Sequence, residues 1–223
     1  MQVDPIWQAV GLLCKSHPWH GVPIGAEAPE RVTVYVEMVP TDTVKYELDK
    51  DSGLLTVDRP QKYSNVPPSL YGLVPQTLCA ERAAAFCAEK TGRSGLVGDM
   101  DPLDICVITE KQITHGNIVV QAIPIGGLRM LDGTEVDDKI VAVLLGDAVY
   151  GGLREASELP HLLLDRLRHY FLTYKQGPDE AHPSCEITHV YSRSEAHEVI
   201  RRSREDYEKR FPGVSKLLAT VLA

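Results

Sequence analysis

Gly98-Asp99-Met100-Asp101-Pro102-Leu103-Asp104 places three carboxylates within six residues, and the apolar run Ile105-Cys106-Val107-Ile108 follows at once. This run predicts a strand that is buried on both faces, and Pro102 limits the backbone before it because its ring fixes φ. Carboxylates this close repel one another unless a cation lies between them. Ligands that are all oxygen atoms favour a hard cation such as Mg²⁺ or Ca²⁺. The stretch predicts either a metal site at the mouth of a core strand or an acidic turn, and a lone D-x-D favours the turn.

The composition is that of a globular protein. The chain has 223 residues, enough for one domain with a sizeable core. Its net charge of −8 argues against a general nucleic-acid or anionic-membrane binder, although a few cations in an acidic site can still hold a phosphate. No run approaches the roughly 18 apolar residues of a membrane helix, and the N-terminus has no signal-peptide pattern. Five cysteines without C-x-x-C spacing favour reduced thiols, so we expect a cytoplasmic protein without nucleic-acid or membrane partners.

The part of the chain between residues 31 and 145 is rich in predicted strands. Alternating or continuous apolar residues predict strands at 31–39, 44–49, 54–59, 105–108, 117–124, 127–130 and 140–145. Asp49-Lys50-Asp51-Ser52-Gly53 and Asp132-Gly133 predict hairpin turns. In the strand at 44–49 the alternation places Lys45 and Glu47 on one polar face, where a solvated ion pair is the simplest interpretation.

Helical patterns dominate the second half. Ser157-Glu158-Leu159-Pro160 opens a helix whose apolar stripe runs to Tyr174, and Ser194 caps a charged helix that ends near Arg210. The arginines of the charged helix lie among acidic residues, so we expect a solvated face there and not a basic patch. Shorter helices are expected at about 5–15, 78–90 and 214–223.

Two loops stand out between these elements. His17-Pro18-Trp19-His20 predicts a packed or surface loop, since its two histidines match no zinc-binding spacing. Residues 60–68 form a proline-rich loop, and such loops often display binding groups.

A strand-rich segment followed by helices predicts an α+β fold, a β-barrel or curled sheet with helices outside it. Acidic and basic side chains recur on the polar faces of the strand-rich part. They are Glu37, Lys45, Glu47, Arg59, Asp99, Asp101, Asp104, Asp132, Asp137 and Lys139. An acidic cluster that also contains Lys, Arg and Tyr suits divalent metals bound together with a phosphate compound.

Two other interpretations of the acidic stretch fail on the residues. An EF-hand loop would place Asp99, Asp101 and Glu110 at positions one, three and twelve, but Asp104 then occupies the position that needs Gly for the sharp turn. A glycosyltransferase D-x-D would need a nucleotide-binding α/β half, and the alternating strand–helix pattern is absent.

Several short motifs, in one order along residues 31–195, carry a resemblance to a known family. The acidic stretch reads D-x-D-P-x-D from Asp99 to Asp104. The other motifs are Glu37 with Pro40, Lys45-Tyr46-Glu47 with Asp49, Val57-Asp58-Arg59, Tyr71-Gly72, Met130 with Asp132, Asp137 with Lys139, and Tyr174-Lys175. In these motifs the sequence resembles the soluble family I inorganic pyrophosphatases. Each motif is weak alone, but all of them in this order make a specific signal.

The resemblance implies a fold and a set of roles. The fold would be a closed five-stranded barrel of the oligonucleotide-binding type with helices packed outside, in one domain that spans residues 1–223. Asp101 would be the general base. The metal ligands would be Asp99, Asp104, Asp132 and Asp137, with support from Glu37 and Glu47. The phosphate ligands would be Lys45, Arg59, Tyr71, Lys139, Tyr174 and Lys175.

The implied reaction is the hydrolysis of inorganic pyrophosphate to two phosphates by a metal-activated water. The implied cofactor is Mg²⁺, several ions per site, with Mn²⁺ or Zn²⁺ as substitutes, and the implied assembly is a homo-oligomer. Residues 1–30 form an N-terminal extension and residues 79–97 an insertion relative to the compact bacterial pattern. The insertion would cover the site entrance or form a subunit contact. An inactive metal- or phosphate-binding relative is the non-enzyme alternative.

Overall fold

The computed structural model describes residues 15–177, 179 and 185–213. The helices expected near the two ends of the chain fall outside these residues, apart from residue 15. None of the helices in these described residues combines the length and the apolar character that a membrane span requires.

Five strands close into a barrel. Their order around the ring is β1, β4, β6, β9 and β7, and the pairing of β7 with β1 closes the ring. The strands are β1 (Val32–Met38), β4 (Leu70–Leu73), β6 (Asp104–Ile108), β9 (Lys139–Leu144) and β7 (Ile118–Asp132). The pair β6–β9 is parallel and the other pairs of the ring are antiparallel. The expectation of a closed five-stranded barrel with helices outside it is therefore confirmed.

Smaller strands extend this barrel. β2 (Val44–Leu48) and β3 (Leu55–Pro60) form a separate two-stranded hairpin. β10 (Cys185–Ser192) pairs with the second half of β7. β5 (Val97–Gly98) and β8 (Glu135–Val136) form a short parallel pair beside the end of β7. Gly53 and Gly133 have φ values of +70° and +62°, so both predicted hairpin turns use the left-handed conformation that glycine permits.

The strand that follows the acidic stretch forms as its residues predict. Ile105 to Ile108 are buried on both faces, since β6 lies between β4 and β9 inside the ring. All seven residues of β1 are buried as well, whereas its alternating pattern predicted only one apolar face. The second face of β1 is covered because a closed barrel with helices outside leaves few strand faces in water.

The two strands predicted at 117–124 and 127–130 are one strand of 15 residues. The prediction was wrong because the register shift between Pro124 and Gly126 is a β-bulge, which interrupts the alternation without ending the strand. Gly126 lies at this bulge, where a Cβ would come within 2.5 Å of the carbonyl oxygen of Tyr191. The bulge thus brings β10 against the barrel.

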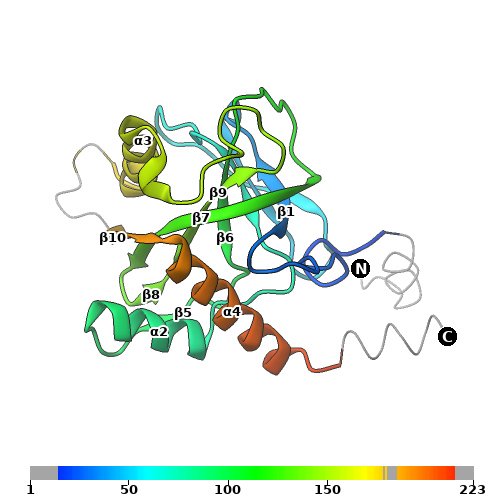
Figure 1. Cartoon of the computed structure of the whole chain (residues 1–223), viewed down its shortest axis with the longest axis vertical. Coiled ribbons are helices and arrows are strands. Elements are labelled where there is room, and N and C mark those ends of the chain that lie inside the picture. The colour runs from blue at the N-terminus through cyan, green and yellow to red at the C-terminus, as the bar shows by residue number, and fades with distance from the viewer. Residues whose placement is uncertain (1–14, 178, 180–184, 214–223) are drawn as a thin grey trace.

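The helices pack outside the barrel (Figure 1). They are α2 (Glu81–Thr91), the 3₁₀ helix η1 (Ala156–Glu158), α3 (His161–Thr173) and α4 (Arg193–Arg210). The single helix predicted from Ser157 is thus two elements, because Pro160 has no backbone N–H and interrupts the helical hydrogen bonds between them. Ser192, and not Ser194, caps α4: its side chain accepts a hydrogen bond from the amide of Glu195.

Two faces of the barrel receive these helices. Leu167, Tyr170 and Phe171 of α3 pack in one apolar cluster with strands β6, β7 and β9. Ala196, Val199 and Ile200 of α4 belong to the cluster that fills the barrel. The charged face of α4 is solvated as predicted, with Arg201, Arg202 and Arg204 paired to glutamates on the same helix.

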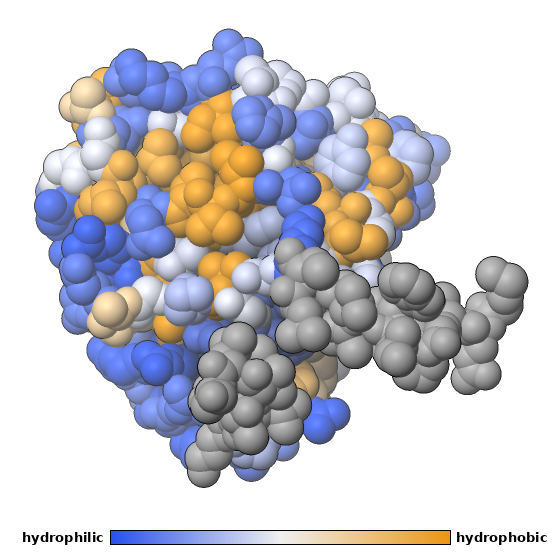
Figure 2. All heavy atoms as spheres, turned by 90° about the vertical axis from the view of Figure 1, so that its right-hand side faces the viewer, coloured by the Kyte–Doolittle hydropathy of each residue, from blue (hydrophilic) through white to orange (hydrophobic). Residues whose placement is uncertain are grey.

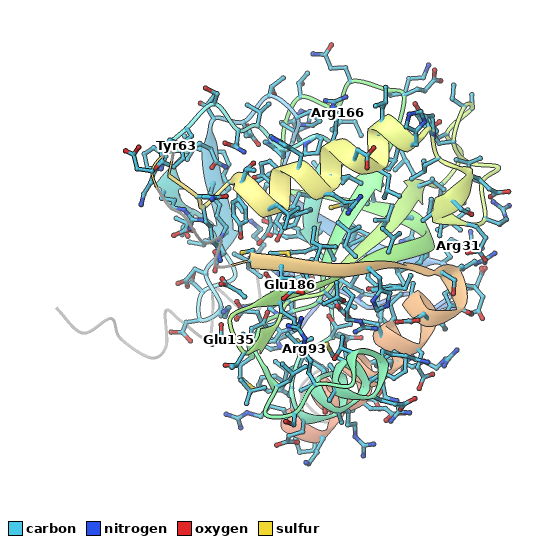
Figure 3. The ribbon with its side chains drawn as sticks, turned by 90° about the vertical axis from the view of Figure 1, so that its left-hand side faces the viewer. Arg31, Tyr63, Arg93, Glu135, Arg166 and Glu186 are labelled. Carbon is cyan, nitrogen blue, oxygen red and sulfur yellow. The ribbon has the colours of Figure 1, made fainter. Side chains whose placement is uncertain are left out.

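Residues 79–97, which the sequence predicted to be an insertion, contain α2, which packs against α4, β5 and β8. Arg93 donates to Glu186 of β10 over 2.7 Å, so the end of the insertion is also tied to the sheet (Figure 3). Phe86 is buried in the barrel cluster beside α4. The insertion therefore forms part of the outer helical layer.

Candidate active site

Two adjoining pockets at one end of the barrel contain all the predicted site residues except Arg59. The first is lined, among others, by Lys45, Tyr71, Asp99, Asp101, Asp104, Asp132, Asp137, Lys139, Tyr174 and Lys175. The second is lined, among others, by Glu37, Lys45, Glu47, Lys50, Tyr71, Asp101 and Asp104. Arg59 lies beside them, as the strand partner of Lys45 in the β2–β3 hairpin. None of the residues from 79 to 97, the segment predicted to be an insertion, lines either pocket.

The acidic residues reach the pockets from three points of the barrel. Asp99 and Asp101 lie in the loop between β5 and β6, and Asp104 is the first residue of β6. Asp132 ends β7, and Asp137 lies in the short connection between β8 and β9. These points meet because β6, β9 and β7 are neighbours in the ring.

Met100 gives the acidic loop its shape. It is a non-glycine residue with a φ of +65°, a left-handed conformation that is uncommon for such a side chain. The next amide, Asp101 N–H, donates to Asp99 Oδ1 over 2.9 Å. Such backbone conformations cluster at functional sites, where the surrounding contacts hold them in place.

Lys139 is the central cation of the first pocket. It stands opposite Asp104 in the parallel register of β6 and β9, and its Nζ lies 2.5 Å from Asp104 Oδ2. The same ammonium also donates to Asp137 and lies 5.5 Å from the centroid of the Phe171 ring. Burial opposes the charge of Lys139, but the two carboxylates raise its pKa well above the usual value.

Three carboxyl groups that line the two pockets have raised pKa values because burial disfavours their charged forms. The pKa of Glu37 rises to about 8 through burial and the nearby charge of Asp104. The pKa of Asp99 rises to about 8 through burial and the charge of Asp137. The pKa of Asp137 rises to about 6, since burial outweighs the attraction of Lys139. The site thus holds more carboxylates than its own cations neutralise.

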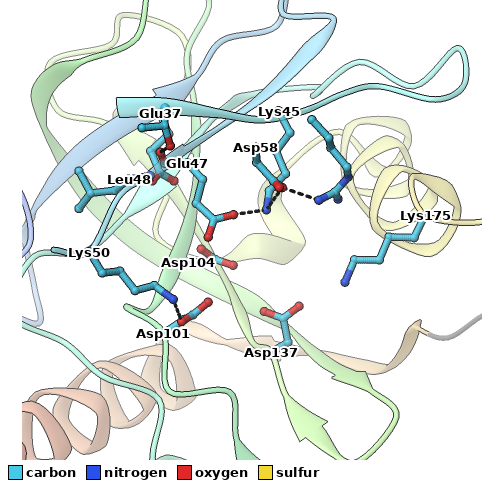
Figure 4. A network of polar contacts seen from close by, with 12 residues as sticks. Glu37, Lys45, Glu47, Leu48, Lys50, Asp58, Asp101, Asp104, Asp137 and Lys175 are labelled. Atoms are coloured by element: carbon cyan, nitrogen blue, oxygen red, sulfur yellow. Dashed lines mark hydrogen bonds and ion pairs between the residues drawn. The ribbon is translucent and has the colours of Figure 1, made fainter. Parts of the chain in front are cut away.

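The remaining cations line the outer part of the site. Lys45 donates to Glu47 and also pairs with Asp58 at 3.0 Å, and Arg59 contacts the same Asp58 carboxylate (Figure 4). On the opposite side, at the end of α3, Lys175 Nζ lies 2.6 Å from Asp132 Oδ2. The Lys45–Glu47 pair, which the alternation alone assigned to a solvated face, therefore lines the second pocket, and Lys45 lines the first as well.

The donor chemistry fits a hard divalent cation. The acidic groups present only carboxylate oxygens, the ligands that Mg²⁺ prefers, and the raised pKa values of Glu37, Asp99 and Asp137 reflect buried negative charge that a cation would compensate. In the described part of the chain no three such groups already converge as a metal site, and Lys139 Nζ lies between Asp104 and Asp137. The residues that would hold the metal are Asp99, Asp104, Asp132 and Asp137.

Sequence reasoning missed Lys50 and the pair Arg129–Asp138. Lys50 donates to Asp101 from the tip of the β2–β3 hairpin. Arg129 is fully buried, donates to Asp138, and lies 2.7 Å from Glu195 of α4. A charged residue in the apolar run of β7 was a usable signal for a buried ion pair. Lys50 gave no such signal, since it occupies a polar turn.

Barrel and site together define a class: small β-barrel proteins whose carboxylates and cations suit a divalent metal bound with a phosphate compound. Comparisons with known proteins agree with this class. The family model described as inorganic pyrophosphatase matches residues 34–208. An inorganic pyrophosphatase of Chlamydia trachomatis is 50% identical over 196 residues, which cover 86% of this chain and 94% of that protein.

More distant relatives give the same result. A protein of Chlamydomonas reinhardtii named soluble inorganic pyrophosphatase 2 is 35% identical, with 88% of this chain and 91% of that protein covered. The crystal structure of inorganic pyrophosphatase from Thermus thermophilus superposes with a TM-score of 0.71 at 27% identity, covering 86% of this chain and 99% of that one. The chain therefore belongs to the inorganic pyrophosphatase family, and the resemblance found in its motifs is confirmed.

Proposed function

We propose that the chain hydrolyses inorganic pyrophosphate to two phosphates with a metal-activated water and with Asp101 as the general base. Membership of the inorganic pyrophosphatase family supports the reaction itself. The observation that carries the residue roles is the convergence of the D-x-D-P-x-D carboxylates with Lys45, Lys139 and Lys175 in one place. These residues come from elements that are far apart in the sequence.

In this proposal the carboxylates bind the metal and accept the proton, whereas the cations bind the phosphates. Bound Mg²⁺ supplies a water of lowered pKa and neutralises charge on the phosphates. Asp99, Asp104, Asp132 and Asp137 hold the metal, and Glu37 and Glu47 support it from the second pocket. Asp101 takes the proton of the attacking water, since a carboxylate within one hydrogen bond of that water can act as its base.

The cationic and phenolic side chains bind the substrate and stabilise the phosphate that leaves. Positive charge fixed in advance around developing negative charge is a large part of what phosphoryl transfer needs. The residues that we assign to this role are Lys45, Arg59, Tyr71, Lys139, Tyr174 and Lys175. Mg²⁺ is the proposed cofactor, and Mn²⁺ or Zn²⁺ are the proposed substitutes.

The test is phosphate release from pyrophosphate by the purified protein with Mg²⁺, followed by addition of excess EDTA. We expect rapid release that EDTA stops and that further Mg²⁺ restores. A folded protein that releases no phosphate with Mg²⁺ or Mn²⁺ would favour the alternative, an inactive metal- or phosphate-binding relative. The presence of Asp101 and of the cations argues against that alternative, because an inactive relative is expected to lose one or the other.

We also propose that the chain is cytoplasmic, has no nucleic-acid or membrane partner, and forms homo-oligomers. The acidic net charge of −8 supports the absence of a nucleic-acid partner. Figure 2 shows apolar side chains gathered on one face of the molecule, a surface of the kind that subunit contacts bury. Sedimentation velocity of the purified protein measures the assembly directly, and a monomer at all concentrations would contradict the proposed homo-oligomer.

A further inference from the structure

The backbone of Asp101 is held on both sides, whereas its carboxylate reaches toward solvent. Its amide donates to Asp99 Oδ1 over 2.9 Å, and its carbonyl oxygen accepts from the amide of Cys79 over 2.8 Å. Pro102 restricts the chain immediately afterwards. The side chain is 41% exposed, so the direction of its carboxylate depends on a partner outside this loop.

Lys50 supplies that partner from the turn between β2 and β3, where its Nζ donates to Asp101 Oδ1 (Figure 4). The turn is well defined: Asp49 Oδ1 accepts from the amide of Ser52 over 2.7 Å, and the amide of Gly53 donates to the carbonyl of Asp49 over 2.9 Å. An ion pair between two side chains that are each about 40% exposed contributes little to stability. Its consequence is the orientation of the Asp101 carboxylate.

His17 holds the same turn from the other side. His17 is 7% exposed, and its Nδ1 accepts from the amides of Trp19 and His20 over 3.2 and 3.4 Å. The proton of the neutral ring therefore lies on Nε2, which donates to the carbonyl of Lys50 over 3.2 Å. The ring also lies against Gly53, where a Cβ would come within 2.8 Å of His17 Cδ2.

The loop of residues 17–20 is also linked, through Thr77, to the residues that follow Asp101 in the sequence. The indole N–H of Trp19 donates to the carbonyl of Thr77 over 2.7 Å. The hydroxyl oxygen of Thr77 accepts from the amide of Leu103 over 2.9 Å, two residues after Asp101. This loop lies outside residues 34–208, the part matched by the family model.

We propose that the loop of residues 17–20 is a strut that positions Asp101: His17 holds the turn that carries Lys50, and Lys50 orients the carboxylate. The proposal rests on the proposed function, because it takes Asp101 as the general base. His17 and Lys50 are positioning residues, since both act through Asp101. A general base that is turned away from its water loses rate without loss of substrate binding.

The test is a double-mutant cycle measured as kcat for pyrophosphate at saturating Mg²⁺. We expect Lys50→Met to lower kcat about tenfold and His17→Phe about fivefold, each with little change in KM. If both act through the same carboxylate, the double variant falls about tenfold and not about fiftyfold. Multiplied effects, or a wild-type kcat in Lys50→Met, would overturn the strut.

Two further variants separate positioning from general damage to the loop. His20→Phe makes the same replacement in the same loop, and His20 bonds to the hydroxyl of Tyr207 in α4 over 2.8 Å, with its ring centroid 4.7 Å from that of His17. We expect it to keep the wild-type kcat. His17→Gln keeps a side-chain N–H donor for the carbonyl of Lys50 and should restore most of the rate. Equal losses in His17→Phe and His20→Phe, or no rescue by His17→Gln, would contradict the proposal.

Hydrogen–deuterium exchange tests the strut without any activity. His17→Phe should raise exchange in the turn of residues 49–53, whereas His20→Phe should leave it unchanged. Unchanged exchange in His17→Phe would overturn the strut even in an active enzyme. A wild-type protein that releases no phosphate would instead overturn the proposed function, so the two failures are distinguishable.

Discussion

Asp104 and Lys139 stand opposite each other in the parallel strands β6 and β9, and Lys139 Nζ lies 2.5 Å from Asp104 Oδ2. The same ammonium contacts Asp137. Lys139 is therefore placed between two carboxylates that we assign to metal binding, and its single positive charge compensates part of their negative charge. This relationship would couple the proposed metal site to the proposed phosphate site.

Replacement of Lys139 by Met should separate its effect on metal binding from its effect on the phosphate substrate. Removing the ammonium leaves Asp104 and Asp137 with more uncompensated charge, so Mg²⁺ affinity without substrate should not fall. The substrate loses a cation at the site of developing charge, so kcat/KM should fall by about a hundredfold. Calorimetric Mg²⁺ titration and steady-state kinetics measure the two effects, and a parallel loss of both would show that Lys139 only maintains the fold.

Asp101→Asn should abolish most of the turnover while Mg²⁺ binding survives. The amide keeps the shape of the side chain but cannot accept the proton of the attacking water, so kcat should fall by about 10²–10⁴-fold. Glu135→Gln provides the control, because Glu135 lines the same pocket and has no assigned role. Near-normal kcat in Asp101→Asn would remove Asp101 from the role of base.

The buried Arg129 should be the most sensitive charge in the fold. It is fully buried and donates to Asp138, so Arg129→Leu leaves an uncompensated buried carboxylate and should cost about 3–5 kcal/mol. Adding Asp138→Leu removes that carboxylate and should recover a large part of the loss. Arg202→Leu is the matched control: Arg202 also lies over the Phe86 ring but pairs with Glu198 at the surface. Urea unfolding measures all three, and a double variant that is no more stable than Arg129→Leu would contradict the explanation.

Asp147 should make the fold less stable in acid. Burial alone would raise its pKa, but four hydrogen bonds, from the hydroxyl of Thr109 and from the amides of Glu110, Val149 and Tyr150, lower the pKa to about 2. The unfolded chain has a pKa near 3.9 and takes up the proton first, so about 2 kcal/mol is present above about pH 4 and is lost as the pH falls toward about 2.

The variant Asp147→Asn tests the predicted loss of folding stability in acid. Its amide group cannot accept from all four donors, so the variant should be less stable than the wild type at neutral pH. The difference in stability should shrink as the pH falls, because the wild type loses the stabilisation that its ionised Asp147 provides. Urea midpoints measured between about pH 7 and about pH 3 give the result, and a difference that is constant across this range would contradict the assignment.

Gly72 should tolerate no side chain. It lies in β4, where a Cβ would come within 2.0 Å of the carbonyl oxygen of Tyr35 in β1, so Gly72→Ala forces two barrel strands apart. We expect a loss of more than about 3 kcal/mol. Gly152→Ala is the control, since nothing lies within 4 Å of its Cβ position, and thermal unfolding should show it within about 1 kcal/mol of the wild type.

Local chemistry explains why much of this molecule was predictable. The continuous apolar run after Asp104 predicted the buried strand β6, and Gly53 and Gly133 predicted two turns, because period and turn residues act within a few positions. The motif order predicted the family and a set of site residues that, except for Arg59, line the two pockets. The helix start at Ser194 was wrong by two residues, since capping depends on the hydroxyl that the turn actually presents.

The sequence by itself therefore determined the strand-rich first part, the turns and the acidic and basic residues of the site. The tertiary structure alone decided that Lys139 lies against Asp104, 35 residues away, that Lys50 reaches Asp101, 51 residues away, and that β7 runs through its bulge. Spacing along a chain carries no information about such partners. They are chosen by the register of neighbouring strands and by burial, which exist only once the barrel has closed.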